Sequence, residues 1–188
     1  IGIGLIAFIF LFKIGEAFLG RMSIIFYKEI GFSKSDIGIF SKGLGWLTTI
    51  IFTILGGIFT VRLGILKSVV IAGIFMATTN ILFSILYWVG KSYFIFSIAV
   101  ILDDIAAAFA TVAFVAFIST LINRKYTATQ YALLASIGTF GRTTLAASSG
   151  TLVDQLNGNW GVFFIITALM VTPSLIILHF IKNKINFN

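Results

Sequence analysis

The chain has 188 residues, of which 59% are hydrophobic and only 10% charged, and its mean hydropathy is +1.11. Soluble domains carry about 25% charged residues, so this composition indicates a polytopic membrane protein and excludes an ordinary soluble domain. The net charge is +7, but the basic residues stand singly between apolar segments and form no patch, which argues against nucleic acid as a partner. Cysteine is absent, which excludes disulfides and thiolate metal sites. We expect neither a metal nor a cofactor.

Six segments of the sequence are long and apolar enough to cross a membrane, which takes about 20 residues in a helix. We expect spans at about residues 3–26, 37–61, 68–89, 93–121, 129–153 and 161–181. Ser35 or Asp36 could cap the second helix. The sequence has no basic leader, so we expect no cleavable signal peptide at its front. It begins with Ile1 rather than methionine, so we expect a fragment of a longer protein.

The basic residues predict the orientation of these spans. One set of helix ends carries Arg62, Lys67, Arg124, Lys125, Lys182 and Lys184. The opposite set carries Lys28, Lys34 and Lys91, diluted by Glu29, Asp36 and Asp154. Lys and Arg accumulate in cytoplasmic loops, so we expect both termini of this segment to be cytoplasmic.

Two similar segments indicate an internal repeat. GIFTVRLG begins at Gly57 and GTLVDQLNG at Gly150, an offset of 150 − 57 = 93 residues. Each would close the second helix of a triplet, giving repeat one at about residues 1–90 and repeat two at about 91–188. Because three is odd, the triplets have opposite orientations, and such inverted repeats build each half of a major facilitator transporter. We predict an all-α, polytopic, single six-helix bundle of this kind; the alternative is a chance likeness, since glycine before a loop is common.

Several polar residues fall near the middle of these apolar spans. They are Lys13, Glu16, Asn80, Asp103, Asp104 and Arg142. A charge at the centre of a bilayer costs at least about 2.5–3.5 kcal/mol on insertion scales, so such side chains should face the bundle interior or water. Lys13 and Glu16, three residues apart, share one face of a helix. The three acids, all on the two helices that lead the repeats, are candidates for proton coupling.

A structural role is the alternative for these charges. Arg142 could neutralise Asp103 or Asp104 and lock the fourth helix to the fifth, while Lys13 could pair with Glu16 within one helix. Both interpretations can hold together, because one arginine can satisfy one aspartate and leave the other free to titrate.

Two stretches at predicted helix ends are candidates for a gate. YTATQYALLAS contains Thr129 and Gln130 at the start of the fifth helix, although Thr127 or Thr129 could simply be a helix cap. RLGILK resembles a degenerate copy of the facilitator loop signature, with glycine and basic residues but without the usual acid. Its candidates are Arg62, Gly64 and Lys67.

Taken together, several segments resemble the AmpG muropeptide permeases of the major facilitator superfamily. They are FKIGEAF, GFSKSDIG with SKGLG, GGIFTVRLG, FATVAFVAFISTLINRKYTATQYALLAS and GRTTLAASSGTLVD. The resemblance implies import of anhydromuropeptides, which are cell-wall sugar–peptide fragments, across the bacterial inner membrane, driven by protons. It covers the C-terminal six of the family's core spans, so the implied partners include a missing N-terminal six-helix half as well as solute, protons and lipid bilayer.

The chemistry of such a solute suggests roles for four residues. Lys13 and Arg142 could bind a carboxylate, and Asn80 could bind a sugar hydroxyl or an amide, although packing is its alternative role. Trp46 could stack on a sugar or act as an interfacial anchor.

Three alternative functions fit the sequence to different degrees. A facilitator for another solute, such as acetyl-CoA, fits the same features. A membrane-embedded enzyme is disfavoured because the sequence has neither a His-Glu-x-x-His motif nor a glycine-lysine phosphate loop. The third alternative is a half that folds but does not transport.

Overall fold

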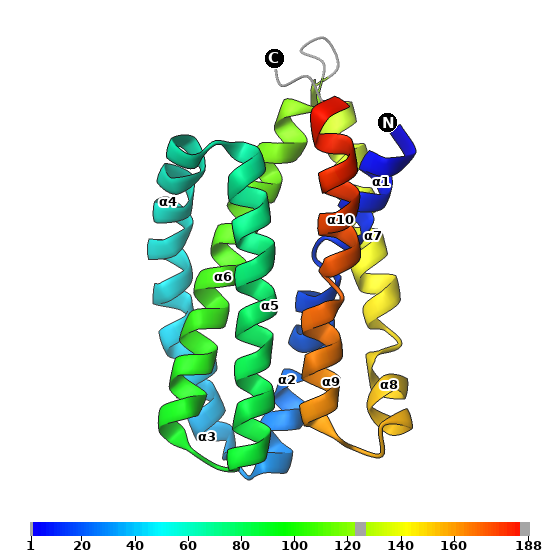
Figure 1. Cartoon of the computed structure of the whole chain (residues 1–188). Helices are drawn as coiled ribbons and strands as arrows, with labels where there is room; N and C mark the ends of the chain where they lie inside the picture. Colours follow the sequence, from blue (N-terminus) through cyan, green and yellow to red (C-terminus); the bar gives the residue numbers. More distant parts are fainter. Residues whose placement is uncertain (1, 123–126, 185–188) are drawn as a thin grey trace.

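A computed structural model describes residues 2–122 and 127–184, and the regular structure in these ranges is helical. The elements are α1 (Gly2–Leu11), α2 (Ile14–Ile30), α3 (Lys34–Ile37), a π-helical segment (Gly38–Leu44), α4 (Gly45–Leu63), α5 (Ile65–Val89), α6 (Tyr93–Thr120), α7 (Thr127–Ala146), α8 (Ser149–Gln155), α9 (Trp160–Leu169), α10 (Thr172–Ile181) and a 3₁₀ turn (Lys182–Lys184). The predicted spans correspond to rods that run alternately up and down (Figure 1): α1–α2, α3–α4, α5, α6, α7–α8 and α9–α10. The prediction of an all-α polytopic membrane protein is confirmed.

Within the described ranges, five helical segments are long and apolar enough to cross a membrane. They are Gly2–Ile30, Lys34–Leu63, Ile65–Val89, Tyr93–Thr120 and Trp160–Ile181. The remaining predicted span, 129–153, is α7 with α8, which runs alongside the other rods (Figure 1). It contains Arg142 and several hydroxyl side chains, which lower its apolar character.

Three of the rods are interrupted, whereas the sequence pattern predicts continuous helices. Residues 12–13 separate α1 from α2, residues 147–148 separate α7 from α8, and residues 170–171 separate α9 from α10. Pro173 explains the last break, because it lacks an N–H and its ring clashes with the preceding turn. The first break has no proline, and it lies at Lys13, whose side chain is buried.

The start of the second rod corrects a sequence expectation. Ser33 is the N-cap, in place of Ser35 or Asp36, and α3 begins at Lys34 rather than Ile37. Ser33 Oγ accepts from the Asp36 N–H at 3.1 Å, and Asp36 Oδ2 accepts from the Ser33 N–H at 2.9 Å. This reciprocal capping box satisfies two otherwise free donors, which is why Ser33 prevails.

The start of the fifth rod corrects a second expectation. Because α7 already begins at Thr127, Thr129 lies inside the first turn and does not cap the helix.

The two predicted sets of basic residues lie at opposite ends of the bundle. The α4–α5 turn, which holds Arg62 and Lys67, lies at the same end as the end of α10, where Lys182 follows (Figure 1). The α2–α3, α5–α6 and α8–α9 connections lie at the other end. Arg124 and Lys125 fall outside the described residues, and which end faces the cytoplasm stays a prediction.

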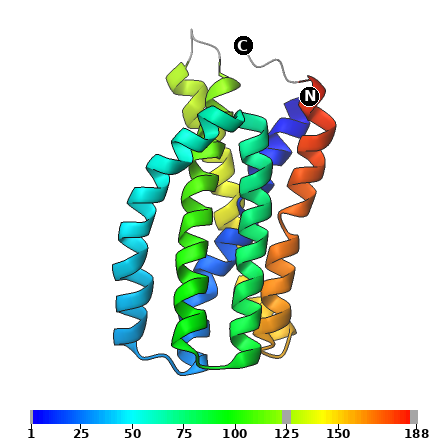
Figure 2. The same ribbon diagram turned by 60° about the vertical axis from the view of Figure 1, so that its left-hand side comes forward.

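The packing of the rods gives two of them central positions. The α6 helix packs against α4 and α5, while α1 and α2 pack against α7 and against the α9–α10 rod. The α5 helix also packs against α9, which joins the two sides of the bundle (Figures 1 and 2). The first and fourth rods are thus each covered by several neighbours.

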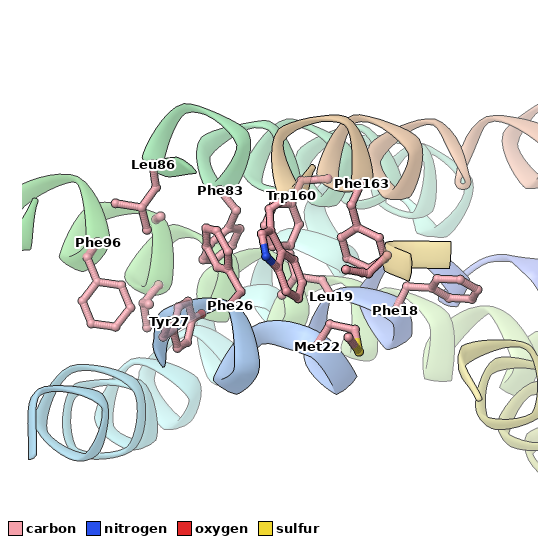
Figure 3. Close-up of a cluster of buried hydrophobic side chains, with 14 of the residues drawn as sticks. Phe18, Leu19, Met22, Phe26, Tyr27, Phe83, Leu86, Phe96, Trp160 and Phe163 are labelled. Atoms are coloured by element: carbon pink, nitrogen blue, oxygen red, sulfur yellow. The ribbon is translucent and has the colours of Figure 1, made fainter. Parts of the chain in front are cut away.

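Buried apolar side chains form two clusters at different heights. The α2–α9 cluster joins α2, α5, α9 and the start of α6, and its aromatic members include Phe26, Tyr27, Phe83, Phe96 and Trp160 (Figure 3). The α1–α10 cluster joins α1, α10, the first half of α5 and the second half of α6. Dispersion contacts within each cluster hold the rods together, and several polar side chains lie between the clusters.

Candidate functional site

Between the two clusters, four rods carry polar side chains at about the same height. We call this set the polar layer: Lys13, Glu16, Thr79, Asn80, Asp103, Asp104 and Thr167. In α5, for example, Met76 belongs to the α1–α10 cluster and Phe83 to the α2–α9 cluster, with the polar pair between them. Groups of this kind away from water need partners, and most of them find one.

Lys13 lies at the break between α1 and α2 and is only 7% exposed. Its Nζ donates a 2.8 Å hydrogen bond to Thr111 Oγ1 and lies 3.0 Å from Glu16 Oε2. Glu16 Oε2 has no hydrogen-bond partner among the described residues. Its contact with Lys13 is therefore an ion pair whose geometry is not that of a hydrogen bond. The Thr111 hydroxyl donates a 2.7 Å hydrogen bond to the Ala107 carbonyl. The ammonium is thereby partnered twice inside the bundle.

The adjacent aspartates face different helices. Asp103 Oδ1 accepts a 3.1 Å hydrogen bond from Thr79 Oγ1 of α5. Asp104 instead lies against Gly45 of α4, so closely that a Cβ at position 45 would collide with its Oδ2. In the described structure this buried oxygen has no hydrogen-bond partner. The pair therefore consists of one hydroxyl-bonded carboxylate and one without such a bond.

Asn80 connects α5 to α9 rather than facing open space. It is 2% exposed, and its Nδ2 donates a 3.1 Å hydrogen bond to Thr167 Oγ1. Thr167 in turn donates to the Phe164 carbonyl at 2.9 Å. Gly15 of α2 approaches the Thr167 carbonyl so closely that no Cβ fits between them. Three helices therefore meet in direct contact here.

Two cavities adjoin the polar layer on the side of α7. The α2–α7 cavity has a volume of about 390 Å³, and its polar lining comes from Lys13, Glu16, Arg21, Arg142 and Thr143. The α1–α7 cavity has a volume of about 150 Å³ and is lined by residues that include Lys13, Thr111, Tyr131, Gly138 and Arg142.

Lys13 and Arg142 line both cavities. Arg142 is half-buried. It forms no ion pair with Asp103 or Asp104 in residues 2–122 and 127–184; the ion pair found there is that of Lys13 with Glu16. The α6–α7 lock considered from the sequence is thus not formed, whereas the Lys13–Glu16 pair is.

Trp46 lies apart from these cavities. Its side chain is 68% exposed at the start of α4 and lines neither of them. Its position near a helix end is compatible with the interfacial anchoring considered from the sequence.

The residues predicted to form a gate gather at one end of the bundle. Gly64, whose φ is +84°, forms the α4–α5 turn, with a pocket of about 310 Å³ lined by Gly64 and Lys67. Arg62 closes α4. Thr129 and Gln130 lie in the first turn of α7, at the same end as this turn (Figure 1).

Sequence reasoning missed three polar contributors. Arg21 lies within the first candidate span, and a charged residue inside a membrane span is itself a signal of function. Thr79 and Thr167 gave no such signal, because hydroxyls are common in membrane helices and only packing pairs them with Asp103 and Asn80.

Comparison with known proteins places the chain among named transporters. No protein-family model matches it. It is 37% identical over 182 residues to the putative transporter AmpG 4 of Rickettsia conorii, covering 97% of this chain and 43% of that protein. It is 33% identical to the putative transporter AmpG 1 of Rickettsia prowazekii, covering 97% and 41%. It is 31% identical over 171 residues to the anhydromuropeptide permease of Escherichia coli, covering 90% and 34%.

The chain spans less than half the length of these relatives, while the similarity covers almost all of the chain. The resemblance found in the sequence motifs is confirmed by this similarity. The chain is therefore a homologue of the AmpG transporters over 97% of its length.

Proposed function

We propose that the chain is the C-terminal six-helix half of a proton-coupled importer of anhydromuropeptides that works by alternating access in the bacterial inner membrane. The similarity to the Escherichia coli anhydromuropeptide permease supports the solute. The structural observation that carries the proposal is the interrupted first rod, where the Lys13–Glu16 ion pair borders a cavity of about 390 Å³. Buried charge beside a cavity, within apolar helices, marks a solute or proton path.

The break in the first rod has a chemical use in a transporter. Secondary transporters bind their solutes near the middle of the bilayer, where discontinuous helices leave backbone groups free. The N-terminal end of α2 begins just after Lys13, and Glu16 lies in its first turn, where the helix dipole favours negative charge. The break thus offers charged side chains and free N–H groups at one place.

The contacts between rods support the proposed inverted repeat. If rods one to three correspond to rods four to six, the contact of α4 with α6 corresponds to that of α7 with α1 and α2. The contact of α5 with α6 likewise corresponds to that of the α9–α10 rod with α1 and α2. Cytoplasmic termini, and a gate at the end that holds Arg62, Gly64, Lys67, Thr129 and Gln130, belong to the same proposal.

In this proposal an acid takes up and releases a proton as the cavity alternates between the two sides. Glu16 can do so if movement separates it from Lys13, and Asp104 because a buried oxygen has no hydrogen-bond partner among the described groups. Asp103 is the third candidate, held by Thr79. Asn80 and Trp46 can contribute to solute binding only in another arrangement of the helices, since neither lines the cavities here.

Uptake by reconstituted protein tests the proposal. The chain is purified alone and after co-expression with the N-terminal half of the Rickettsia conorii relative, and both samples are placed in liposomes with an alkaline interior. We expect labelled anhydromuropeptide to accumulate only in the co-expressed sample, because one wall of the solute path is otherwise missing, and a protonophore to stop it. Uptake by the chain alone, or accumulation that ignores the protonophore, would contradict the proposal.

A further inference from the structure

Arg21 is a charged residue inside the membrane to which the proposed function gives no role. It lies nine residues before the end of α2 at Ile30, or about 13 Å along the helix axis, within the candidate span Gly2–Ile30. A guanidinium at such a depth is costly unless it faces water, a ligand or a partner charge. Its side chain lines the α2–α7 cavity and forms no ion pair with any described residue.

Arg142 lines the same cavity from the opposite side, on α7. It too has no ion pair in the part of the chain that the structure describes. The cavity is therefore bordered by two guanidiniums, one from each helix, in addition to the Lys13–Glu16 pair.

The charges of the cavity do not balance. Lys13 is neutralised by Glu16 and also donates to Thr111, so it has little capacity left for a ligand. Arg21 and Arg142 leave the lining with two uncompensated positive charges. An anion inside the cavity would supply the missing negative charge.

We propose that Arg21 and Arg142, rather than Lys13, bind a carboxylate of the transported solute in the α2–α7 cavity. This inference deepens the proposed function and rests on it for the identity of the solute. Guanidinium groups match a carboxylate because each is planar and donates two parallel hydrogen bonds. The volume of about 390 Å³ is within the usual range of ligand pockets. Ala17 and Gly20, on the same lining, take up little of it.

A charge-selective thiol reaction tests the site without knowledge of the solute. The chain has no cysteine, so Thr143→Cys places one exposed thiol on the cavity lining beside Arg142. In the reconstituted 188-residue chain, we measure the rate of its reaction with an anionic methanethiosulfonate (sulfonate) and with a cationic one (trimethylammonium). Each rate is divided by the rate with free cysteine. We expect the anion to be favoured on the order of tenfold, because a cleft of one charge sign concentrates counter-ions.

Matched variants assign that preference to the two arginines. Arg21→Gln and Arg142→Gln should each reduce it severalfold, while Arg21→Lys should keep most of it. Lys28→Gln removes an exposed cation from the same helix outside the cavity and should leave it unchanged. Equal normalised rates in the parent protein, a preference that Arg21→Gln leaves intact, or a thiol that reacts with neither reagent would each overturn the anion site.

Protection by solutes then separates the anion site from the proposed solute. An anhydromuropeptide with free carboxylates should slow the reaction at position 143, while the same molecule with its carboxylates amidated should not. Equal protection by both would overturn the carboxylate assignment but leave muropeptide binding standing. An anion preference that depends on Arg21, with no protection by either molecule, would support the anion site and contradict the muropeptide as its ligand.

Discussion

Lys13, at the break between α1 and α2, donates a 2.8 Å hydrogen bond to Thr111 of α6, 98 positions away in the sequence. The bond joins the first rod to the fourth, which are the two rods that carry Glu16, Asp103 and Asp104. It also holds the ammonium beside Glu16, so the geometry of the polar layer depends on this contact.

Replacing the acceptor should weaken the bundle measurably. Thr111→Val keeps the shape of the side chain and removes the hydroxyl, so we expect a loss of about 1–2 kcal/mol in the free energy of unfolding. Denaturant titration in detergent measures it. Thr53→Val is the control, since Thr53 is exposed and its hydroxyl bonds within its own helix, to the Thr49 carbonyl. A loss as large in the control would mean that the Lys13 contact is not the cause.

The close approach of α2 to α9 predicts intolerance of a single methyl group. Gly15→Ala would drive its Cβ into the Thr167 carbonyl, and overpacking of this kind costs about 1–3 kcal/mol in unfolding free energy. Gly57→Ala in α4 has open space and should be neutral or stabilise the helix by up to about 1 kcal/mol. The thermal unfolding midpoints of the two variants and the parent in detergent measure these effects. A Gly15→Ala protein as stable as the parent would show that the helices do not approach so closely.

Neutral substitutions at the three acids should separate coupling from structure in the assembled transporter. We expect Glu16→Gln or Asp104→Asn to abolish accumulation against a gradient while solute exchange continues, because the proton carrier is lost but the path is not. Asp103→Asn is the comparison for these two changes. It also removes a carboxylate, but it keeps an oxygen that can accept the hydrogen bond from Thr79.

Accumulation and exchange in the same liposomes, together with protein yield, measure these effects. A reduced yield for Glu16→Gln, with normal accumulation per molecule, would assign that acid to structure, since Lys13 would lose its ion-pair partner. If all three neutral variants accumulate solute normally and express well, proton coupling by these acids is wrong.

Labelling from either side of the membrane tests the orientation. A cysteine replacing Lys67 at the start of α5 should react with an impermeant thiol reagent only from the cytoplasmic side, and one replacing Asp154 at the end of α8 only from outside. The chain contains no other cysteine, so there is no background. The opposite labelling pattern would contradict the proposed orientation of the chain in the membrane.

Composition and local pattern were sufficient for the architecture. Span length and hydropathy are properties of contiguous residues, so six helical rods could be located from the sequence to within a few residues. The charges within the spans could be located in the same way, because charged residues are costly and rare in the apolar interior of a membrane. The family likeness, read from motifs, was also available without coordinates.

Only the tertiary structure decided which of these charges meet. Asp103 and Asp104 are neighbours in sequence, yet one contacts Thr79 of α5 and the other lies against Gly45 of α4, because successive helical residues point about 100° apart. Pairing of Arg142 with an aspartate was one alternative from the sequence, but in the structure Arg142 lines a cavity with Arg21.

The break at Lys13 contains no proline, and the partner of its side chain, Thr111, lies 98 positions away in the sequence. A membrane span is selected by the apolar character of its own residues, whereas a buried polar partner is selected by how separate rods pack. The sequence of one rod does not contain that second piece of information.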